Sequence, residues 1–211
     1  MDTFTQFDGN LLIGIQQALN ADWLTPIMKV ITAFGEYGIF WILVCVALLA
    51  FRRTRRLGII CTLSLALTFI LCNGIIKPLV DRTRPFEAFS AVQPFLPHPG
   101  DASFPSGHTA NSMGPAWGMF VSSREETAPM GWRGDGVSAR TVHKWSIAAI
   151  VLALLIGLSR LYLGMHYPSD VLCAILVGMM SATVVCAAAE KYESKHGIIG
   201  QRDTSGSGQE R

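Results

Sequence analysis

The sequence predicts an all-α integral membrane protein, a bundle of six transmembrane helices in which the first helix is irregular. Half of the 211 residues are hydrophobic and only 15% are charged, whereas charged residues make up about 25% of an average soluble domain. The mean hydropathy is +0.38. The apolar residues are gathered in long runs without charge, and many of the basic residues lie in the connections between these runs. These observations favour a membrane bundle over a soluble domain.

Four apolar runs predict four of the six helices. Residues 57–76 and 171–189 each reach the length of about 20 residues that crosses a hydrocarbon core of about 30 Å at 1.5 Å per residue. Residues 37–51 are shorter, and residues 146–163 carry a polar pair near their end. We therefore expect these two helices to include flanking residues.

Two further segments predict the remaining helices. Residues 106–121 are uncharged but contain Pro115 and three glycines. A membrane bundle tolerates such residues where neighbouring helices satisfy the freed backbone groups, so we expect a span here. Residues 10–34 are mildly apolar and broken by Asp22 and Pro26. They are interpreted either as an irregular first span or as interfacial helices.

The basic residues predict the orientation of the bundle. Four arginines between residues 52 and 56 place that connection in the cytoplasm by the positive-inside rule. Alternation then puts residues 77–105 and 163–170 outside and the basic connection 122–145 inside. We expect residues 1–190 to form one membrane domain and residues 191–211 to form a polar, disordered cytoplasmic tail.

Composition also excludes several classes of function. The net charge of +2 and the absence of a long basic run other than the arginine cluster give no footprint for nucleic acid. The five cysteines lie inside apolar runs and are expected to be small buried hydrophobes. Neither cysteines with histidines nor carboxylates cluster in the pattern of a metal site, so we expect no metal and no cofactor. The N-terminus lacks the basic region of a cleaved signal peptide.

Three polar segments interrupt the apolar pattern on the predicted outer side. They are residues 77–85, residues 105–108 and residues 159–170. They are far apart in the sequence, yet the topology brings all three to one end of one bundle. Ionisable groups at a membrane edge are costly and usually functional, so this end is the predicted site.

The cations and the helix start in these segments suit a phosphate. Arg84 and Arg160 offer bidentate contacts to phosphate oxygens, and Lys77 adds a point charge. Ser106 and Gly107 lie where a helix begins, and the free N–H groups and positive end of a helix form an anion site. Arg82 is expected to be only an interfacial side chain.

Two histidines and one carboxylate complete the predicted chemistry. His166 precedes Asp170 by one helical turn, with Pro168 at the expected helix start between them. A carboxylate of Asp170 that accepts a hydrogen bond from one ring nitrogen of His166 would leave the other nitrogen as a nucleophile. His108 would then act as the general acid for the leaving oxygen. Each residue alone fits an ordinary packing or capping role, but the whole set at one depth favours a functional site.

The arrangement resembles the three-part signature of the type 2 phosphatidic acid phosphatase (PAP2) superfamily. The matching residues are Lys77, Arg84 and Pro85, then Pro105 to His108, then Ser159, Arg160, His166 and Asp170. The resemblance implies a metal-independent phosphatase in which His166 forms a phosphohistidine, Asp170 orients it and His108 protonates the leaving group. It also implies that Lys77, Arg84, Ser106, Gly107 and Arg160 bind the phosphate. Soluble vanadate-dependent haloperoxidases share this pocket, but the apolar spans disfavour their chemistry.

The expected substrate carries a terminal phosphate at the outer membrane surface and an apolar tail in the bilayer. The small chain is similar to bacterial enzymes that act on undecaprenyl pyrophosphate or phosphatidylglycerophosphate. The predicted outward site favours undecaprenyl pyrophosphate in a bacterial plasma membrane, with phosphatidic acid and diacylglycerol pyrophosphate as further alternatives. No obligate protein partner is evident. A transporter, whose site would lie near the midplane, and a non-catalytic lipid-binding protein are the alternatives of other classes.

Overall fold

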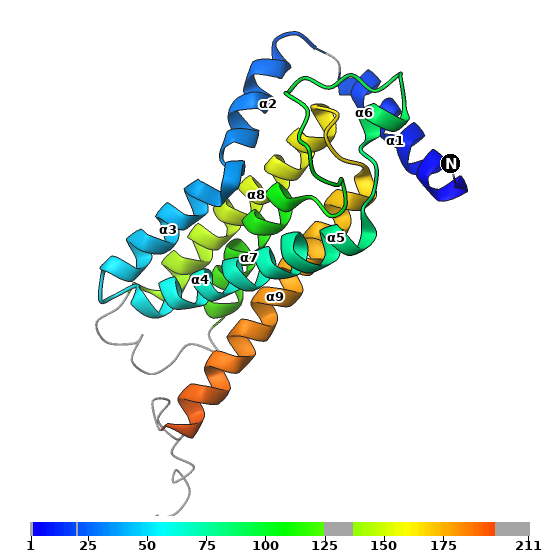
Figure 1. Cartoon of the computed structure of the whole chain (residues 1–211). Coiled ribbons are helices and arrows are strands. Elements are labelled where there is room, and N and C mark those ends of the chain that lie inside the picture. Colours follow the sequence, from blue (N-terminus) through cyan, green and yellow to red (C-terminus); the bar gives the residue numbers. More distant parts are fainter. Residues whose placement is uncertain (1, 20, 125–136, 197–211) are drawn as a thin grey trace, which may run out of the picture.

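The computed structural model describes residues 2–19, 21–124 and 137–196, and all regular structure within these ranges is helical. Figure 1 shows the helices packed along one another, with the shorter ones gathered at one end. Their bounds are α1 Thr3–Leu19, α2 Leu24–Ala33, η1 Glu36–Gly38, α3 Ile39–Ala50, α4 Arg55–Phe69, η2 Ile70–Ile76, α5 Lys77–Val80, α6 Pro85–Ala88, α7 Gly107–Ser122, α8 Ala139–Tyr162 and α9 Pro168–Lys195.

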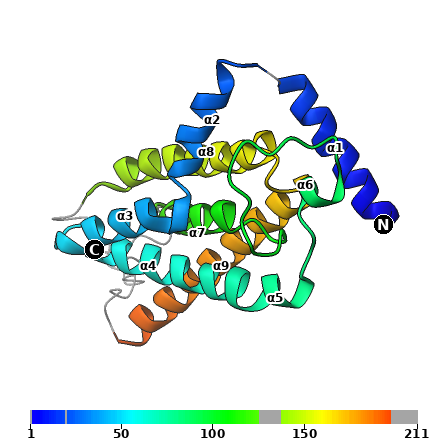
Figure 2. The ribbon, with the colours of Figure 1, turned by 45° about the horizontal axis from the view of Figure 1, so that its top comes forward.

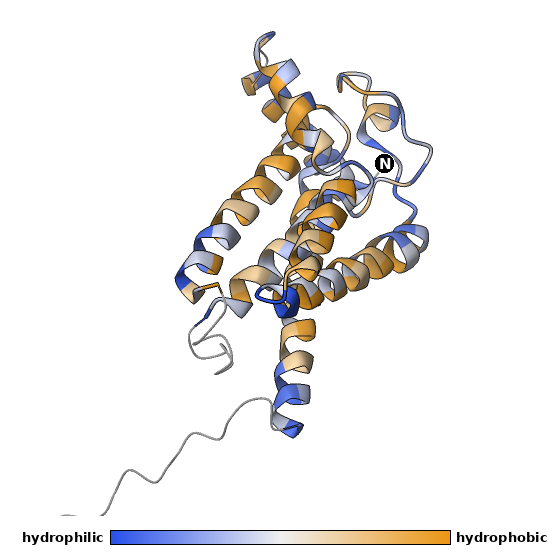
Figure 3. Ribbon diagram, turned by 90° about the vertical axis from the view of Figure 1, so that its left-hand side faces the viewer, coloured by the Kyte–Doolittle hydropathy of each residue, from blue (hydrophilic) through white to orange (hydrophobic). Residues whose placement is uncertain are grey.

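Four helical stretches of the described residues are long and apolar enough to cross a membrane. They are Leu24–Ala50, Arg55–Ala88, Ala139–Tyr162 and Pro168–Lys195. Figure 3 shows hydrophobic residues along these helices and hydrophilic residues near their ends. Large apolar side chains such as Leu43 are exposed on them, as expected for surfaces that face lipid. The all-helical membrane class is confirmed, and a count of six membrane crossings stays a prediction.

The segment 10–34 is not one helix. Its first part belongs to α1, and its second part, α2, continues through η1 into α3 as one stretch of 27 residues. The backbone turns sharply between α2 and α3, where Tyr37 has φ +49° and Gly38 has φ +69°. Glycine adopts such angles without a Cβ clash, so the stretch bends here and continues.

Helix α7 is the central helix of the bundle, and it packs against α4, α8 and α9. Small residues allow the close approach of α9: a Cβ on Gly178 would lie 2.9 Å from Cβ of Met113 and 3.0 Å from the Ala110 carbonyl oxygen. The indole nitrogen of Trp41 donates to the Ser112 hydroxyl at 2.8 Å. Neighbouring helices thus surround the less apolar segment predicted at residues 106–121.

The two ends of the bundle differ. At one end lie α1, α5, α6, the connection 89–106 and the start of α9, and Figures 1 and 2 both place α1 beside α6 and this connection. At the other end, Arg56 in the first turn of α4 pairs with Glu193 near the end of α9 at 2.5 Å. Helix α9 extends to Lys195, into the predicted tail, and residues 197–211 of that tail lie outside the described residues.

Candidate active site

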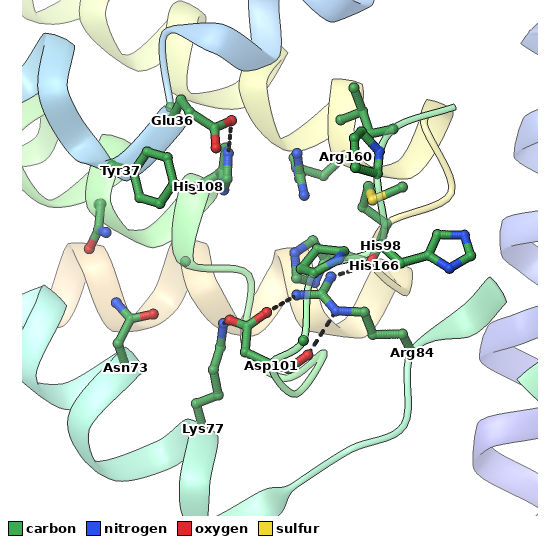
Figure 4. Close-up of a pocket in the computed structure, with 18 of the residues that line it drawn as sticks. Glu36, Tyr37, Asn73, Lys77, Arg84, His98, Asp101, His108, Arg160 and His166 are labelled. Atoms are coloured by element: carbon green, nitrogen blue, oxygen red, sulfur yellow. Dashed lines mark hydrogen bonds and ion pairs between the residues drawn. The ribbon is translucent and has the colours of Figure 1, made fainter. Parts of the chain in front are cut away.

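A cavity of about 810 Å³ opens at the end of the bundle where α5, α7 and the α8–α9 connection meet. Figure 4 shows its side chains converging from these separate elements. The structure brings six of the eight predicted site residues to its lining, while Ser106 and Asp170 lie outside it. The six are Lys77, Arg84, Gly107, His108, Arg160 and His166.

His166 lies in the short connection between α8 and α9, where Gly164 turns the chain with φ +72°. The ring is 2% exposed. Its Nδ1 lies 2.8 Å from the Ser103 carbonyl oxygen, to which it donates, and 3.5 Å from Oδ2 of Asp170. The backbone carbonyl therefore holds the proton on Nδ1 and leaves Nε2 for the cavity.

The Asp170 carboxylate also accepts from other donors, so Nδ1 of His166 approaches it only to 3.5 Å. Oδ2 accepts from the Tyr167 N–H at 2.9 Å and from the Ser103 hydroxyl at 2.5 Å. Oδ1 accepts from Nη1 of Arg82 at 2.6 Å. Asp170 is fully buried, so it acts on the His166 ring as a nearby negative charge.

Burial lowers the pKa of His166 to about 4, although Asp170 opposes this effect, and the positive charge of Arg160 lowers the pKa further. The ring is therefore neutral at pH 7, which is the protonation state that a nitrogen nucleophile requires.

Two of the cations of the cavity, Lys77 and Arg84, converge on Asp101. Nζ of Lys77 lies 2.5 Å from Oδ2, and Nη2 of Arg84 lies 2.6 Å from Oδ1. Arg84 also donates to the backbone carbonyls of Asp101 and Met165. Partial burial alone would raise the pKa of Asp101, but the hydrogen bonds from the two cations outweigh it and lower this pKa to about 2. An anion thus already lies where two cations meet.

Arg160 is the third cation, at the end of α8. It is 3% exposed, and its Nη1 donates to the Thr32 hydroxyl at 3.0 Å. Its Nε is buried and has no hydrogen-bond partner among the described residues. An unpaired guanidinium N–H beside a cavity is a donor for an anionic ligand.

His108 and its neighbours form the start of α7. Nε2 of His108 lies 3.2 Å from Oε2 of Glu36, which reaches over from η1. Gly107 lies so close to Asn73 that an added Cβ would be 3.0 Å from its Oδ1. Ser106 is fully buried, and its N–H donates to the Asp170 carbonyl at 3.2 Å. The backbone N–H of Ser106 is therefore bonded to the first turn of α9 instead of facing the cavity.

Sequence reasoning missed four residues of this region. Arg82 is not an interfacial side chain, because it pairs with Asp170 and with Asp8 of α1. Asp101 and Glu36 carry no motif that distinguishes them from solvated loop acids. Only Asp8 offered a signal, since an acidic residue in a helix that packs on apolar neighbours needs a partner. No group of three or more His, Cys, Asp or Glu residues in the described ranges is placed to hold a metal ion.

Comparisons with known proteins identify the family of the chain. The family model of the PAP2 superfamily matches residues 57–193. The chain is 32% identical to an undecaprenyl-diphosphatase of Sulfolobus acidocaldarius over 74% of its own length and 66% of that relative. It is 29% identical to phosphatidylglycerophosphatase B of Bacillus subtilis over 81% of its own length and 78% of that relative.

A solved structure supports the fold. The crystal structure of a transmembrane PAP2-type phosphatidylglycerolphosphate phosphatase from Bacillus subtilis superposes with a TM-score of 0.68 at 24% identity, covering 90% of this chain and 88% of that one. The family match, the sequence relatives and this shared fold together confirm the resemblance seen in the motifs. The chain belongs to the PAP2 superfamily, among relatives that are lipid phosphatases.

Proposed function

We propose that this chain hydrolyses the terminal phosphate of a membrane lipid phosphate or pyrophosphate through a phosphohistidine on His166. One observation carries the proposal. The Ser103 carbonyl holds Nδ1 of His166, while the ring lines a cavity that also receives Lys77, Arg84 and Arg160. A neutral imidazole nitrogen beside three cations suits attack on a phosphate.

The reaction proceeds in two balanced steps. The lone pair on Nε2 of His166 attacks phosphorus, and the bond from phosphorus to the lipid oxygen breaks as His108 gives a proton to that oxygen. His108 gains this proton when the negative charge of the bound phosphate lies beside its ring. Neutral His108 then takes a proton from water, and the hydroxide attacks phosphorus. The P–N bond breaks, which releases phosphate and returns His166 to its neutral form.

The cations supply electrostatic stabilisation. The charge on the transferred phosphoryl oxygens grows in the transition state, and preorganised donors in a poorly hydrated site stabilise it strongly. Arg160 has a free Nε for this purpose. Lys77 and Arg84 become available when the phosphate displaces the carboxylate of Asp101. Gly107 allows the start of α7 to approach the substrate.

We place the active site on the extracytoplasmic face of a bacterial plasma membrane, with the C-terminus in the cytoplasm. The connection between α3 and α4, which carries the arginines of residues 52–56, lies at the end of the bundle opposite α5 and the α8–α9 connection (Figure 1). Residues of these last two elements line the cavity. The positive-inside rule puts that end in the cytoplasm. A lipid tail would remain in the bilayer while the phosphate enters the cavity from the outer surface.

Undecaprenyl pyrophosphate is the leading substrate, supported by the name of the Sulfolobus relative. Phosphatidylglycerophosphate, phosphatidic acid and diacylglycerol pyrophosphate are the alternatives. One contact favours the monophosphate alternatives over undecaprenyl pyrophosphate: the Glu36 carboxylate contacts His108 on the side where the leaving group would lie. The second phosphate of a pyrophosphate would be repelled there, whereas a glycerol oxygen would not.

The test is phosphate release by detergent-purified protein with EDTA present. The substrates are undecaprenyl pyrophosphate, phosphatidylglycerophosphate and phosphatidic acid, and the variants are His166→Ala and His108→Ala. We expect release that survives EDTA and is lost in His166→Ala, and acid-labile labelling of the wild-type protein by ³²P substrate. Full activity of His166→Ala would disprove the nucleophile, and relative kcat/KM values decide between the lipids.

A further inference from the structure

A network of buried polar groups connects helix α1 to the Asp170 carboxylate, outside the lining of the cavity. The guanidinium of Arg82 is shared by two carboxylates: Nη2 donates to Oδ2 of Asp8 at 2.9 Å, and Nη1 donates to Oδ1 of Asp170 at 2.6 Å. Nη1 also donates to the Ser169 hydroxyl at 2.7 Å. Asp8 is 3% exposed and Asp170 is fully buried, so little solvent screens these charges.

Asp8 also caps the first turn of α9. Its Oδ1 accepts the backbone N–H of Ser169 at 3.1 Å, and its Oδ2 accepts the Ser169 hydroxyl. Helix α9 begins at Pro168, so this N–H has no acceptor within its own helix. A carboxylate at the start of a helix is favourable, and here it comes from a different helix.

Helix α1 also packs through apolar contacts that do not involve Asp8. Leu12 is fully buried in a cluster with Val92, Leu161 and Val171. Gly9 lies so close to Phe89 that an added Cβ would be 2.2 Å from its Cζ. A buried aspartate normally destabilises such an interface unless it is paired. Asp8 is paired, and its partners are Arg82 and the start of α9 rather than other groups on α1.

From this geometry we infer that Asp8 and Arg82 are positioning residues that hold Asp170 in place and balance its charge behind His166. The inference rests on the proposed roles of His166 and Asp170. Arg82 carries one positive charge between two negative ones, and its guanidinium carbon lies 3.8 Å from the centroid of the Tyr167 ring. Helix α1 thereby supports the start of α9, where Asp170 lies, although α1 contributes no residue to the cavity lining.

The network makes a prediction about charge that a purely structural role does not. The charged or titratable groups that face His166 are Asp170 of α9, Arg160 of α8, His108 of α7 and Arg84 before α6. Arg82 acts on His166 through Asp170. Loss of the Arg82 charge leaves the negative charge of Asp170 unbalanced, so His166 binds a second proton more readily. Loss of the Asp8 charge lets Arg82 neutralise Asp170 more fully, so the proton is bound less readily.

The experiment compares Arg82→Gln, Arg82→Lys and Asp8→Asn in the full-length protein. The readouts are kcat, KM and the pH dependence of kcat/KM for phosphate release. We expect Arg82→Gln to lower kcat about 10- to 100-fold with little change in KM, since a small displacement of a reacting group has that effect. The acid limb of its kcat/KM profile should move to higher pH by roughly one unit. The acid limb of Asp8→Asn should not move to higher pH. Arg82→Lys should restore the limb but only part of kcat.

The matched control is Arg56→Gln, which removes a similarly buried Arg–Glu pair at the other end of the bundle. It should lower thermal stability without changing the pH profile. If Arg82→Gln does not fold, the nearly isosteric Asp8→Asn carries the test through its loss of kcat, about 3- to 10-fold. Unchanged kcat in the folded variants, or a loss with an unmoved acid limb in Arg82→Gln, overturns the inference. Failure of the proposed function is recognised separately, because His166→Ala would then remain active.

Discussion

Asp101→Asn tests whether the Asp101 carboxylate competes with phosphate for Lys77 and Arg84. The substitution keeps the shape of the side chain and the backbone carbonyl that accepts from Nε of Arg84, but it removes the negative charge. If phosphate must displace that charge, the variant should bind phosphate more tightly. If the carboxylate instead holds the cations in position for phosphate, the variant should bind it more weakly.

The magnitude follows from the pKa of Asp101, which falls from 3.8 to about 2. At 1.36 kcal/mol per unit this corresponds to roughly 2 kcal/mol of interaction with the charged form. The side chain is 52% exposed, so solvent screening reduces the value to about 1 kcal/mol. That free energy is equal to about a fivefold change in affinity.

The assay measures the inhibition constant of orthophosphate, which should fall about fivefold in Asp101→Asn while kcat does not rise. The unfolding temperature should also fall, because the substitution removes a carboxylate whose charge stabilises the folded state. A lowered pKa stabilises the folded state above the unfolded pKa of 3.8, and this stabilisation is lost as the pH falls toward about 2. At pH 7 we therefore expect the unfolding temperature to decrease by about 2–4 °C. The difference between the variant and the wild-type protein should become smaller below pH 4.

Asp81→Asn is the matched control, because it removes an exposed carboxylate from the same end of the bundle. It should change neither the inhibition constant of orthophosphate nor the unfolding temperature. An inhibition constant that is unchanged or larger in Asp101→Asn would refute the competition between carboxylate and phosphate.

Three further predictions concern other contacts. Ser103→Ala removes the 2.5 Å hydrogen bond to Asp170 but keeps the backbone carbonyl that binds His166. We expect kcat to fall about 10-fold with KM unchanged. A change in KM alone would contradict this prediction. Glu36→Gln weakens the contact that supports His108. It should slow the hydrolysis of an alkyl phosphate about 10-fold and that of an aryl phosphate less, since only the alkyl leaving group needs protonation. Equal effects on the two substrates would argue against His108 as the general acid. Gly178→Ala crowds α7 and should lower the free energy of unfolding by about 1–3 kcal/mol, measured against Gly14→Ala, whose added methyl meets no atom within 4 Å.

Much of the bundle follows from the sequence because apolar runs and loop charges are local signals. Residues 57–76 and 171–189 were expected to be spans, and both lie within helical stretches suited to a membrane. The division of residues 10–34 was not predictable in the same way. Whether α2 joins α1 or α3 depends on the backbone at Tyr37 and Gly38, and apolar periodicity does not report a bend.

The candidate site also has a part that the sequence predicts and a part that it does not. Side chains that would contact phosphate have a fixed spacing and chemistry, so the sequence indicates Lys77, Arg84 and Arg160. The acceptor of the His166 proton is a backbone carbonyl, and every residue has one, so no sequence pattern distinguishes Ser103. Arg82 and Arg84 are only two residues apart, yet they contact different sets of groups. Their directions depend on the turn that follows Asp81, whose φ is +42°.

Charge balance explains why the acidic residues are placed as they are. Unpaired cations at a membrane edge are costly, so Lys77 and Arg84 need an anion whether or not substrate is bound, and Asp101 supplies it. Asp170 needs a cation for the same reason, and Arg82 supplies one that does not face the cavity. The two carboxylates therefore differ in one respect that matters for function. Asp101 is half exposed and on a connection, so in the proposed mechanism phosphate displaces it, whereas Asp170 is fully buried and stays in place through the proposed reaction.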